Sequence, residues 1–485
     1  MNSKITILLL SKICFCLGAV MAIPLLMAFY YSEPGAWAFL KAMVAAFAVG
    51  AAGTLYSGRP SLKNITVREG IGTVVFAWLL AGIICGLPLY FFGVLGPLDA
   101  YFESISGLTT TGATVITDLE VLPKCILFWR SLLHWIGGIG IIVIFVALLP
   151  QIGGGAVQLV NAEVSGFTNS RILPRIRTTA IALFYIYSLI TIILTGILVM
   201  LGMSHFDAIN HAFSAIATGG FSTYNSSVTY FDNVPIEIAL GIFMILAGGN
   251  FALYYQAAQG DIKALYKDEE FRAYLALMAV LVVLITCNIV LCTDKYTWLE
   301  GLRHSFFQVA SFGTTTGYVS HDYEQWPSFA KMLLAVAYLT GACAGSTAGG
   351  IKICRFVVLV KTVLSDIKRS LHPQMLLTVH YGNKSLPIGT IMRISRFFFL
   401  YIMVIITLAG INAFAGMDLE EAVFGIGACL SSVGPAFGSI GATGNYAEVP
   451  SLGKLAMTVA MVLGRLELFT ALALLRSEFW KSDRW

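Results

Sequence analysis

The sequence predicts an all-α polytopic membrane protein in which a helix pair precedes four similar helix–loop–helix units around a common axis. The 485 residues are 58% hydrophobic and only 12% charged, with a mean hydropathy of +0.82. This composition is typical of chains that cross a membrane repeatedly. Ten apolar runs are long enough to span a hydrocarbon core of about 30 Å. A polar, glycine-bearing stretch also recurs four times, which predicts a diverged internal repeat.

Two apolar runs open the chain, at about 5–31 and 35–56. Neither is followed by a polar loop of the recurring kind, so the pair stands outside the repeat. The first run is too long for the apolar part of a signal peptide and lacks a small-residue cleavage site, so we expect a retained helix. Residues 1–69 are predicted to form an N-terminal two-helix membrane segment.

Four units follow, each with an apolar run, a short helix, a polar loop and a second apolar run. We place the units at 70–177, 178–272, 273–392 and 393–485, the last with the C-terminal tail. The paired runs are 70–96 with 124–149, 178–202 with 234–258, 273–293 with 327–365, and 393–415 with 451–475. The short helices are expected at 98–109, 206–217, 299–313 and 420–431.

The polar loops align on four glycines, and a hydroxyl residue stands two positions before each. The aligned pairs are Thr110 with Gly112, Thr218 with Gly220, Thr315 with Gly317, and Ser432 with Gly434. Bare backbone at membrane depth must be buried in protein or line a water-filled path. Four loops on one axis would aim carbonyl oxygens at a shared point and replace the water around a cation. The negative end of each short helix would point to the same place.

A tight turn between membrane helices is the alternative interpretation of any single loop. The agreement of four loops in register favours the ion path. Glycine at the aligned position suits either interpretation, because it tolerates backbone angles that other residues avoid.

The distribution of charge predicts the orientation. The linkers between units and the C-terminal tail are basic, whereas the linkers that hold the polar loops are acid-rich, and 203–236 contains neither lysine nor arginine. By the positive-inside tendency, both termini are expected in the cytoplasm and the polar loops enter from outside. Acid-rich linkers at the outer entrance of the path would raise the local cation concentration. Most of their carboxylates, taken singly, are expected to be solvated loop residues.

The sequence gives little support for a metal-binding, redox, nucleotide-hydrolysing or enzymatic function. The nine cysteines show no metal or redox spacing, and no Walker A pattern is present. Nucleotide-dependent control would therefore need a partner, and neither an organic cofactor nor nucleic acid is expected. An intramembrane enzyme that uses His134, His211 or His304 is an alternative. The unrelated positions of these histidines in the repeats disfavour it.

The second apolar run of unit three is interrupted at 341–352. Its small and polar residues are Gly345, Ser346, Thr347, Gly349, Gly350 and Lys352. Glycines at this density unwind or bend a helix. A discontinuous helix at membrane depth usually faces a path, although small residues also serve close helix packing. The pattern favours a gating loop beneath the polar loops.

Arg465 interrupts the last apolar run. An arginine at the centre of a membrane helix costs roughly 2.5–3.5 kcal/mol on insertion scales. We expect it to face the protein interior, water or Glu467, where its charge would repel a passing cation, with snorkelling toward the tail as the alternative. For Arg130, His134 and Asn250, structural pairing is the favoured interpretation.

Three sequence motifs resemble those of a known family. They are Trp129-Arg-Ser-Leu-Leu-His-Trp-Ile-Gly-Gly-Ile-Gly-Ile-Ile, Gly345-Ser-Thr-Ala-Gly-Gly-Ile-Lys352 and Gly464-Arg-Leu-Glu-Leu-Phe-Thr470. With the four loops, they resemble the Trk/Ktr/HKT superfamily of cation transporters, in its TrkH-type bacterial branch, over essentially the whole chain. The resemblance implies four pseudo-symmetric helix–pore loop–helix units around a central pore. It also implies K⁺ (and Rb⁺) uptake across the inner membrane, a homodimer in membrane lipid, and a cytosolic TrkA-type nucleotide-binding regulatory subunit.

The resemblance also implies roles for individual residues. The filter carbonyls would belong to Thr110, Thr111 and Gly112; Thr218, Gly219 and Gly220; Thr315, Thr316 and Gly317; and Ser432, Val433 and Gly434. The gate would fall at about 343–352, with Arg465 facing the pore. Plant relatives that carry sodium have serine at the position of Gly112, so glycine favours potassium. Units two and four depart from the family's Thr-x-Gly-aromatic pattern. A K⁺/Na⁺ or K⁺/H⁺ symporter with the same filter remains the alternative.

Overall fold

The computed structural model of the chain describes residues 3–58, 60, 66–140, 176–372, 378–382, 384–466 and 468–480. In these ranges the chain is helical apart from loops and one short hairpin. By length and composition, six of the described helices could cross a membrane, or eight if each of two sharply bent pairs is one span. The prediction of an all-α polytopic membrane protein is confirmed.

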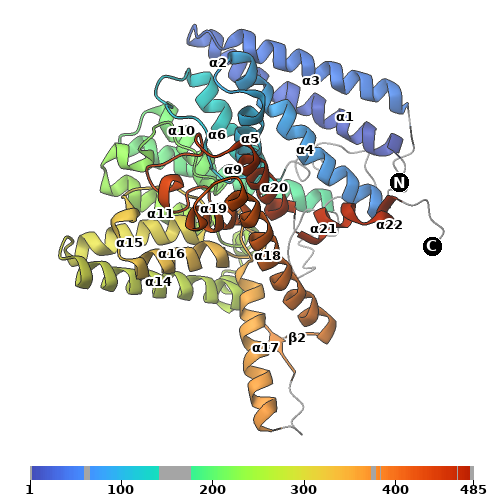
Figure 1. Cartoon of the computed structure of the whole chain (residues 1–485). Helices are drawn as coiled ribbons and strands as arrows, with labels where there is room; N and C mark the ends of the chain where they lie inside the picture. The colour runs from blue at the N-terminus through green and yellow to red at the C-terminus, as the bar shows by residue number, and fades with distance from the viewer. Residues whose placement is uncertain are drawn as a thin grey trace.

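The N-terminal helices form a group at one side of the molecule (Figure 1). This group contains α1 (Ser3–Val20), α2 (Ala22–Tyr30) and α3 (Ala36–Ser57), and α1 and α3 pack on each other and on α4 (Val67–Phe92). Helix α4 begins with a capping box, in which Thr66 Oγ1 accepts from the Glu69 amide and Glu69 Oε2 accepts from the Thr66 amide. These bonds satisfy backbone donors that a helix start otherwise leaves open.

Each of the four units contains the expected short helix. These helices are α5 (Pro97–Leu108), α10 (His205–Ile216), α15 (Trp298–Gly313) and α19 (Leu419–Ser431). Their ends lie within one residue of the predicted ranges. The flanking helices are α4 and α6 (Lys124–Ile139), α9 (Ile176–Met200) and α11 (Val234–Ala247), α14 (Glu269–Thr293) and α16 (Ser328–Thr340), and α18 (Ile388–Phe414) and α20 (Ser451–Leu466).

The interruption predicted in unit three is confirmed. Helix α16 ends at Thr340, and α17 (Ile353–Leu371) begins only after a non-helical segment at 341–352. In Figure 1, α17 extends away from the remaining helices. A hairpin of β1 (His380–Tyr381) and β2 (Lys384–Ser385) follows it, with His380 opposite Ser385.

Two other expected crossings are bent, which the sequence prediction of single runs at 234–258 and 451–475 missed. Helix α11 meets α12 (Phe251–Ala258) at 93°, and α20 meets the helical stretch Leu468–Leu475 at 114°. The first bend falls at Gly248, Gly249 and Asn250, and Asn250 Oδ1 caps α12 by accepting from the Ala252 amide. The two glycines favour the end of α11, and the Asn250 cap begins α12 in a new direction. The end of the run at 124–149 lies outside the described residues after Gly140.

Candidate functional site

The four polar loops meet in a closed ring. A Cβ atom added to any of the four aligned glycines would clash with a backbone carbonyl oxygen of the next loop. The contacts run in order around the ring: Gly112 with Gly219, Gly220 with Thr316, Gly317 with Val433, and Gly434 with Thr111. The loops of units one to four therefore abut in sequence, and that of unit four returns to unit one.

The four loops share one backbone conformation. At the hydroxyl position, φ lies between 54° and 59°, and at the aligned glycine it lies between 80° and 85°. L-residues rarely adopt positive φ, and such strain persists only where the surroundings hold it. Four loops of different sequence are thus held in the same strained form, including that of unit four, which departs from the Thr-x-Gly-aromatic pattern.

Each loop is fixed to the end of its short helix by the same hydrogen bond. The amide of the residue before the aligned glycine donates to the carbonyl five residues earlier, over 2.8–2.9 Å. The four bonds are Thr111 to Ser106, Gly219 to Ser214, Thr316 to Ser311, and Val433 to Ala428. Each C-terminal helix end, with its partial negative charge, is thereby directed at the ring.

Three carboxylates of the acid-rich linkers are buried, as exceptions to the expectation that most of these carboxylates are solvated. Glu103, Asp207 and Glu237 are all buried. Asp207 Oδ1 accepts from Thr223 Oγ1 over 2.7 Å, just beyond the unit-two loop. Glu237 binds Arg303 through both carboxylate oxygens. Such groups are buried only because hydrogen-bonded partners offset the loss of water.

Arg130 and His134 have structural partners, as predicted. Arg130 Nε donates to Glu103 Oε1 over 2.9 Å, and His134 Nδ1 lies 3.2 Å from Ser214 Oγ. The sequence signal for the Glu103 pair was available, because an arginine in an apolar run needs a buried partner and Glu103 lies in the same unit. Among the described residues, no group of three or more His, Cys, Asp or Glu side chains could hold a metal ion.

The interrupted segment 341–352 lies directly against the ring. The Gly349 amide donates to Thr315 Oγ1 over 2.7 Å, and a Cβ on Gly349 would meet the Ser431 carbonyl. Thr347 Oγ1 donates to the carbonyls of Ile216 and Ala247, over 3.1 and 3.2 Å. The segment thus contacts units two, three and four.

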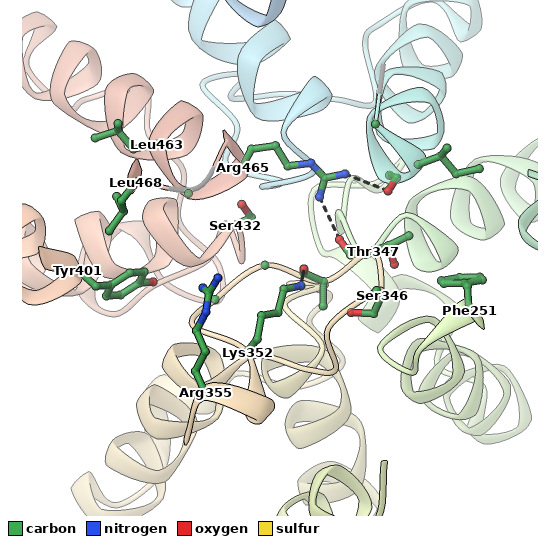
Figure 2. Close-up of a pocket in the computed structure, with 18 of the residues that line it drawn as sticks. Phe251, Ser346, Thr347, Lys352, Arg355, Tyr401, Ser432, Leu463, Arg465 and Leu468 are labelled. Carbon is green, nitrogen blue, oxygen red and sulfur yellow. Dashed lines mark hydrogen bonds between the residues drawn. The ribbon is translucent and has the colours of Figure 1, made fainter. Parts of the chain in front are cut away.

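Arg465 and Lys352 line a cavity beside this segment (Figure 2). The Arg465 guanidinium donates to the Thr347 carbonyl over 3.1 Å and to the Gly138 carbonyl over 2.9 Å. It therefore faces the protein interior, which is one of the predicted environments; Glu467 lies outside the described residues. Lys352 Nζ donates to the Ala348 carbonyl. Gly345, Ser346 and Gly350 complete this side of the cavity.

The comparisons with known proteins agree with this architecture. Residues 36–484 match the TrkH family, described as a cation transport protein. The "Trk system potassium uptake protein TrkH" of Halomonas elongata is 36% identical over 99% of this chain and 100% of its own length. That of Escherichia coli K12 is 36% identical over 96% of each chain.

A solved structure is similar over the whole length. The crystal structure of the potassium transporter TrkH from Vibrio parahaemolyticus matches with a TM-score of 0.90 and 33% identity, covering 99% of this chain and 100% of that one. The resemblance predicted from the loops and three motifs is confirmed. The chain belongs to the TrkH family of cation transport proteins.

Proposed function

We propose that this chain is the K⁺ uptake pathway of a bacterial inner membrane. The observation that carries the proposal is the closed ring of four loops with one backbone conformation. Carbonyl oxygens arranged in this way can take the place of the water around a cation. Relatives at 36% identity are named potassium uptake proteins, which supports K⁺ as the transported ion.

The ring residues act as a filter in this proposal. The carbonyls belong to Thr110, Thr111, Gly112, Thr218, Gly219, Gly220, Thr315, Thr316, Gly317, Ser432, Val433 and Gly434. Close packing of each aligned glycine on the next loop supports a ring of fixed diameter. A fixed ring discriminates ions by the distance at which its oxygens meet them.

The segment 341–352 and Arg465 form the gate. The segment contacts the ring through Gly349, and the Arg465 guanidinium binds its Thr347 carbonyl. At an effective dielectric constant of 20, a guanidinium about 4 Å from a K⁺ ion raises its energy by roughly 4 kcal/mol. That is a factor of about a thousand in occupancy. A shift of the segment that moves Arg465 aside would therefore open the path.

The assembly has both termini in the cytoplasm, two copies of this chain, and a cytosolic TrkA-type nucleotide-binding regulator. The basic linkers support this orientation. Helix α17 supports association, because its exposed apolar side chains lie at helical spacing along one face. They are Val360, Val363, Leu364, Ile367 and Leu371.

Uptake of radiolabelled Rb⁺ into liposomes that contain the purified chain tests the function. We expect unlabelled K⁺ and Rb⁺ to compete strongly and Na⁺ weakly. Empty liposomes give the background.

Reversal potentials that follow only the K⁺ gradient, whatever the pH and Na⁺ concentration, support a channel-like path. A dependence of the reversal potential on H⁺ or Na⁺ would support a symporter. Absence of K⁺-selective flux would refute the proposal.

A further inference from the structure

Glu270, in the first turn of α14, connects two segments that are far apart in sequence. Its Oε1 accepts from the Ala344 amide over 2.5 Å, and its Oε2 accepts from the Tyr381 hydroxyl over 3.3 Å. Ala344 belongs to the interrupted segment 341–352, and Tyr381 belongs to the β1–β2 hairpin. The Glu270 side chain is buried, so these bonds replace the water that its carboxylate has lost.

The neighbouring Glu269 fastens the same hairpin to α14 and α17. Its Oε2 accepts from the Gly382 amide over 2.7 Å, and its carboxylate pairs with Lys361 of α17. Lys361 Nζ also donates to the His380 carbonyl over 2.9 Å. The hairpin is therefore held in place by charged groups that lie mostly outside the core, while Tyr381 reaches inward to Glu270.

The bond between Glu270 and the Ala344 amide lies next to the residues of the segment that contact Arg465 and the ring. The next residue, Gly345, has φ of 77°, and Thr347 and Gly349 beyond it contact Arg465 and Thr315. The whole stretch from Gly341 to Lys352 lacks helical hydrogen bonding of its own. Several of the bonds that set its conformation run to other elements, among them those from the Cys343 amide to the Gly248 carbonyl and from the Ala344 amide to Glu270, and a hydrogen bond to a carboxylate is one of the stronger kinds.

We propose that Glu270 is a positioning residue that holds the segment 341–352 in its closed arrangement. Through the hydrogen bond from Tyr381 to Glu270, the position of the β1–β2 hairpin controls the bond between Glu270 and the Ala344 amide. The inference rests on the proposed function, because it assigns the segment the role of gate. When the hairpin leaves α14, the Tyr381 hydroxyl leaves Glu270 and water reaches the carboxylate. Water then competes for the carboxylate with the Ala344 amide, and the segment is released.

The alternative role for Glu270 is a static anchor that only stabilises the fold. The two roles differ in their relation to Tyr381. If Tyr381 acts through Glu270, its hydroxyl has no effect on gating once the carboxylate is absent. If the two groups are separate anchors, their effects add. A gating measurement on single and double variants therefore separates the roles.

The experiment compares single-channel open probability of the full-length chain in planar bilayers with that of Glu270→Ala, Tyr381→Phe and the double variant. We expect Glu270→Ala to raise open probability about tenfold and Tyr381→Phe about threefold, with the double variant equal to Glu270→Ala alone. Single-channel conductance and K⁺ over Na⁺ selectivity should not change. Tyr255→Phe is the matched control, because it removes a hydroxyl whose hydrogen bond, among the described residues, is the one that it accepts from Gln259.

Two results would overturn the inference. One is an open probability in Glu270→Ala at or below that of the unaltered chain, and the other is a double variant in which both increases multiply in full. If Glu270→Ala fails to reach the membrane, Glu270→Gln replaces it in the same comparison. Failure of the proposed function itself would be seen earlier, as absence of K⁺-selective current in the unaltered chain.

Discussion

Arg130 Nε lies 2.9 Å from Glu103 Oε1, in an ion pair whose side chains are 1% and 0% exposed. Glu103 also accepts from the Val115 amide over 2.9 Å, and the Arg130 guanidinium stacks over Phe221 at 4.0 Å. One pair therefore joins the strands that leave the loops of units one and two. A charge pair of this kind is costly to bury, and its value lies in the geometry that it fixes.

Arg130→Met should destabilise the protein strongly, by about 3–5 kcal/mol, because it leaves the Glu103 carboxylate buried without its counter-charge. We also expect weaker discrimination of K⁺ from Na⁺ in the molecules that fold. Thermal unfolding in detergent and Rb⁺ uptake with Na⁺ as competitor measure the two effects. Arg303→Met is the control, since its pair with Glu237 leaves Arg303 26% exposed. Equal effects of the two variants would contradict the special role of the buried pair.

Gly112→Ser should weaken the preference for K⁺ over Na⁺. The φ of 84° at Gly112 costs a side-chain-bearing residue about 1–3 kcal/mol, and the new Cβ would press on the Gly219 carbonyl. Both effects displace ring oxygens. Competition of Na⁺ against labelled Rb⁺ measures the change. Gly389→Ser serves as the control, because a Cβ there meets nothing within 4 Å; unchanged Na⁺ competition in Gly112→Ser would argue against the filter assignment.

Arg465→Ala should raise K⁺ flux at matched expression. It removes the positive charge from the cavity and the bonds that hold the Thr347 and Gly138 carbonyls. Arg465→Lys should give an intermediate flux, because lysine keeps the charge but lacks the planar fork that reaches both carbonyls. Initial rates of Rb⁺ uptake measure the order. Arg476→Ala, at an exposed position nearby in sequence, should leave the rate unchanged. A flux in Arg465→Ala at or below that of the unaltered chain would make Arg465 a structural residue.

Much of the ring could be predicted from the sequence because its geometry is local. The bond from Thr111 to Ser106 recurs in all four units, so residue types at fixed offsets before each glycine carry the pattern. The short helices followed from the same spacing. The bend at Gly248 had a local signal too, in two glycines before a helix-capping asparagine, but the length of the apolar run outweighed it.

The contacts of Glu270 had no such signal. Its partners Ala344 and Tyr381 are 74 and 111 positions away, and each is an ordinary residue in its own segment. The burial of three carboxylates in the acid-rich linkers had no signal for a related reason. Composition shows that carboxylates such as Asp207 lie near the membrane surface, but only the fold brings Thr223 within 2.7 Å of it.

Acidification should destabilise the region beyond the unit-three loop, through His321. Burial lowers the pKa of His321, an effect that Arg303 reinforces and that Asp322 and Glu237 oppose. His321 Nε2 is hydrogen-bonded to the Tyr296 hydroxyl over 2.7 Å. The His321 ring stacks on the His304 ring, with 4.4 Å between the ring centroids. These contacts favour the neutral ring.

The sign of the effect follows from proton uptake. A histidine with a lowered pKa binds fewer protons in the folded state than in the unfolded state, so its contribution is constant well above its ordinary pKa of about 6.5 and decreases as the pH falls below it. We expect the unfolding temperature in detergent to fall between about pH 7 and pH 5, and His321→Gln to fall less steeply. His380→Gln, exposed on the hairpin, should keep the slope of the unaltered chain. Parallel slopes for His321→Gln and the unaltered chain would exclude His321 as the titrating group.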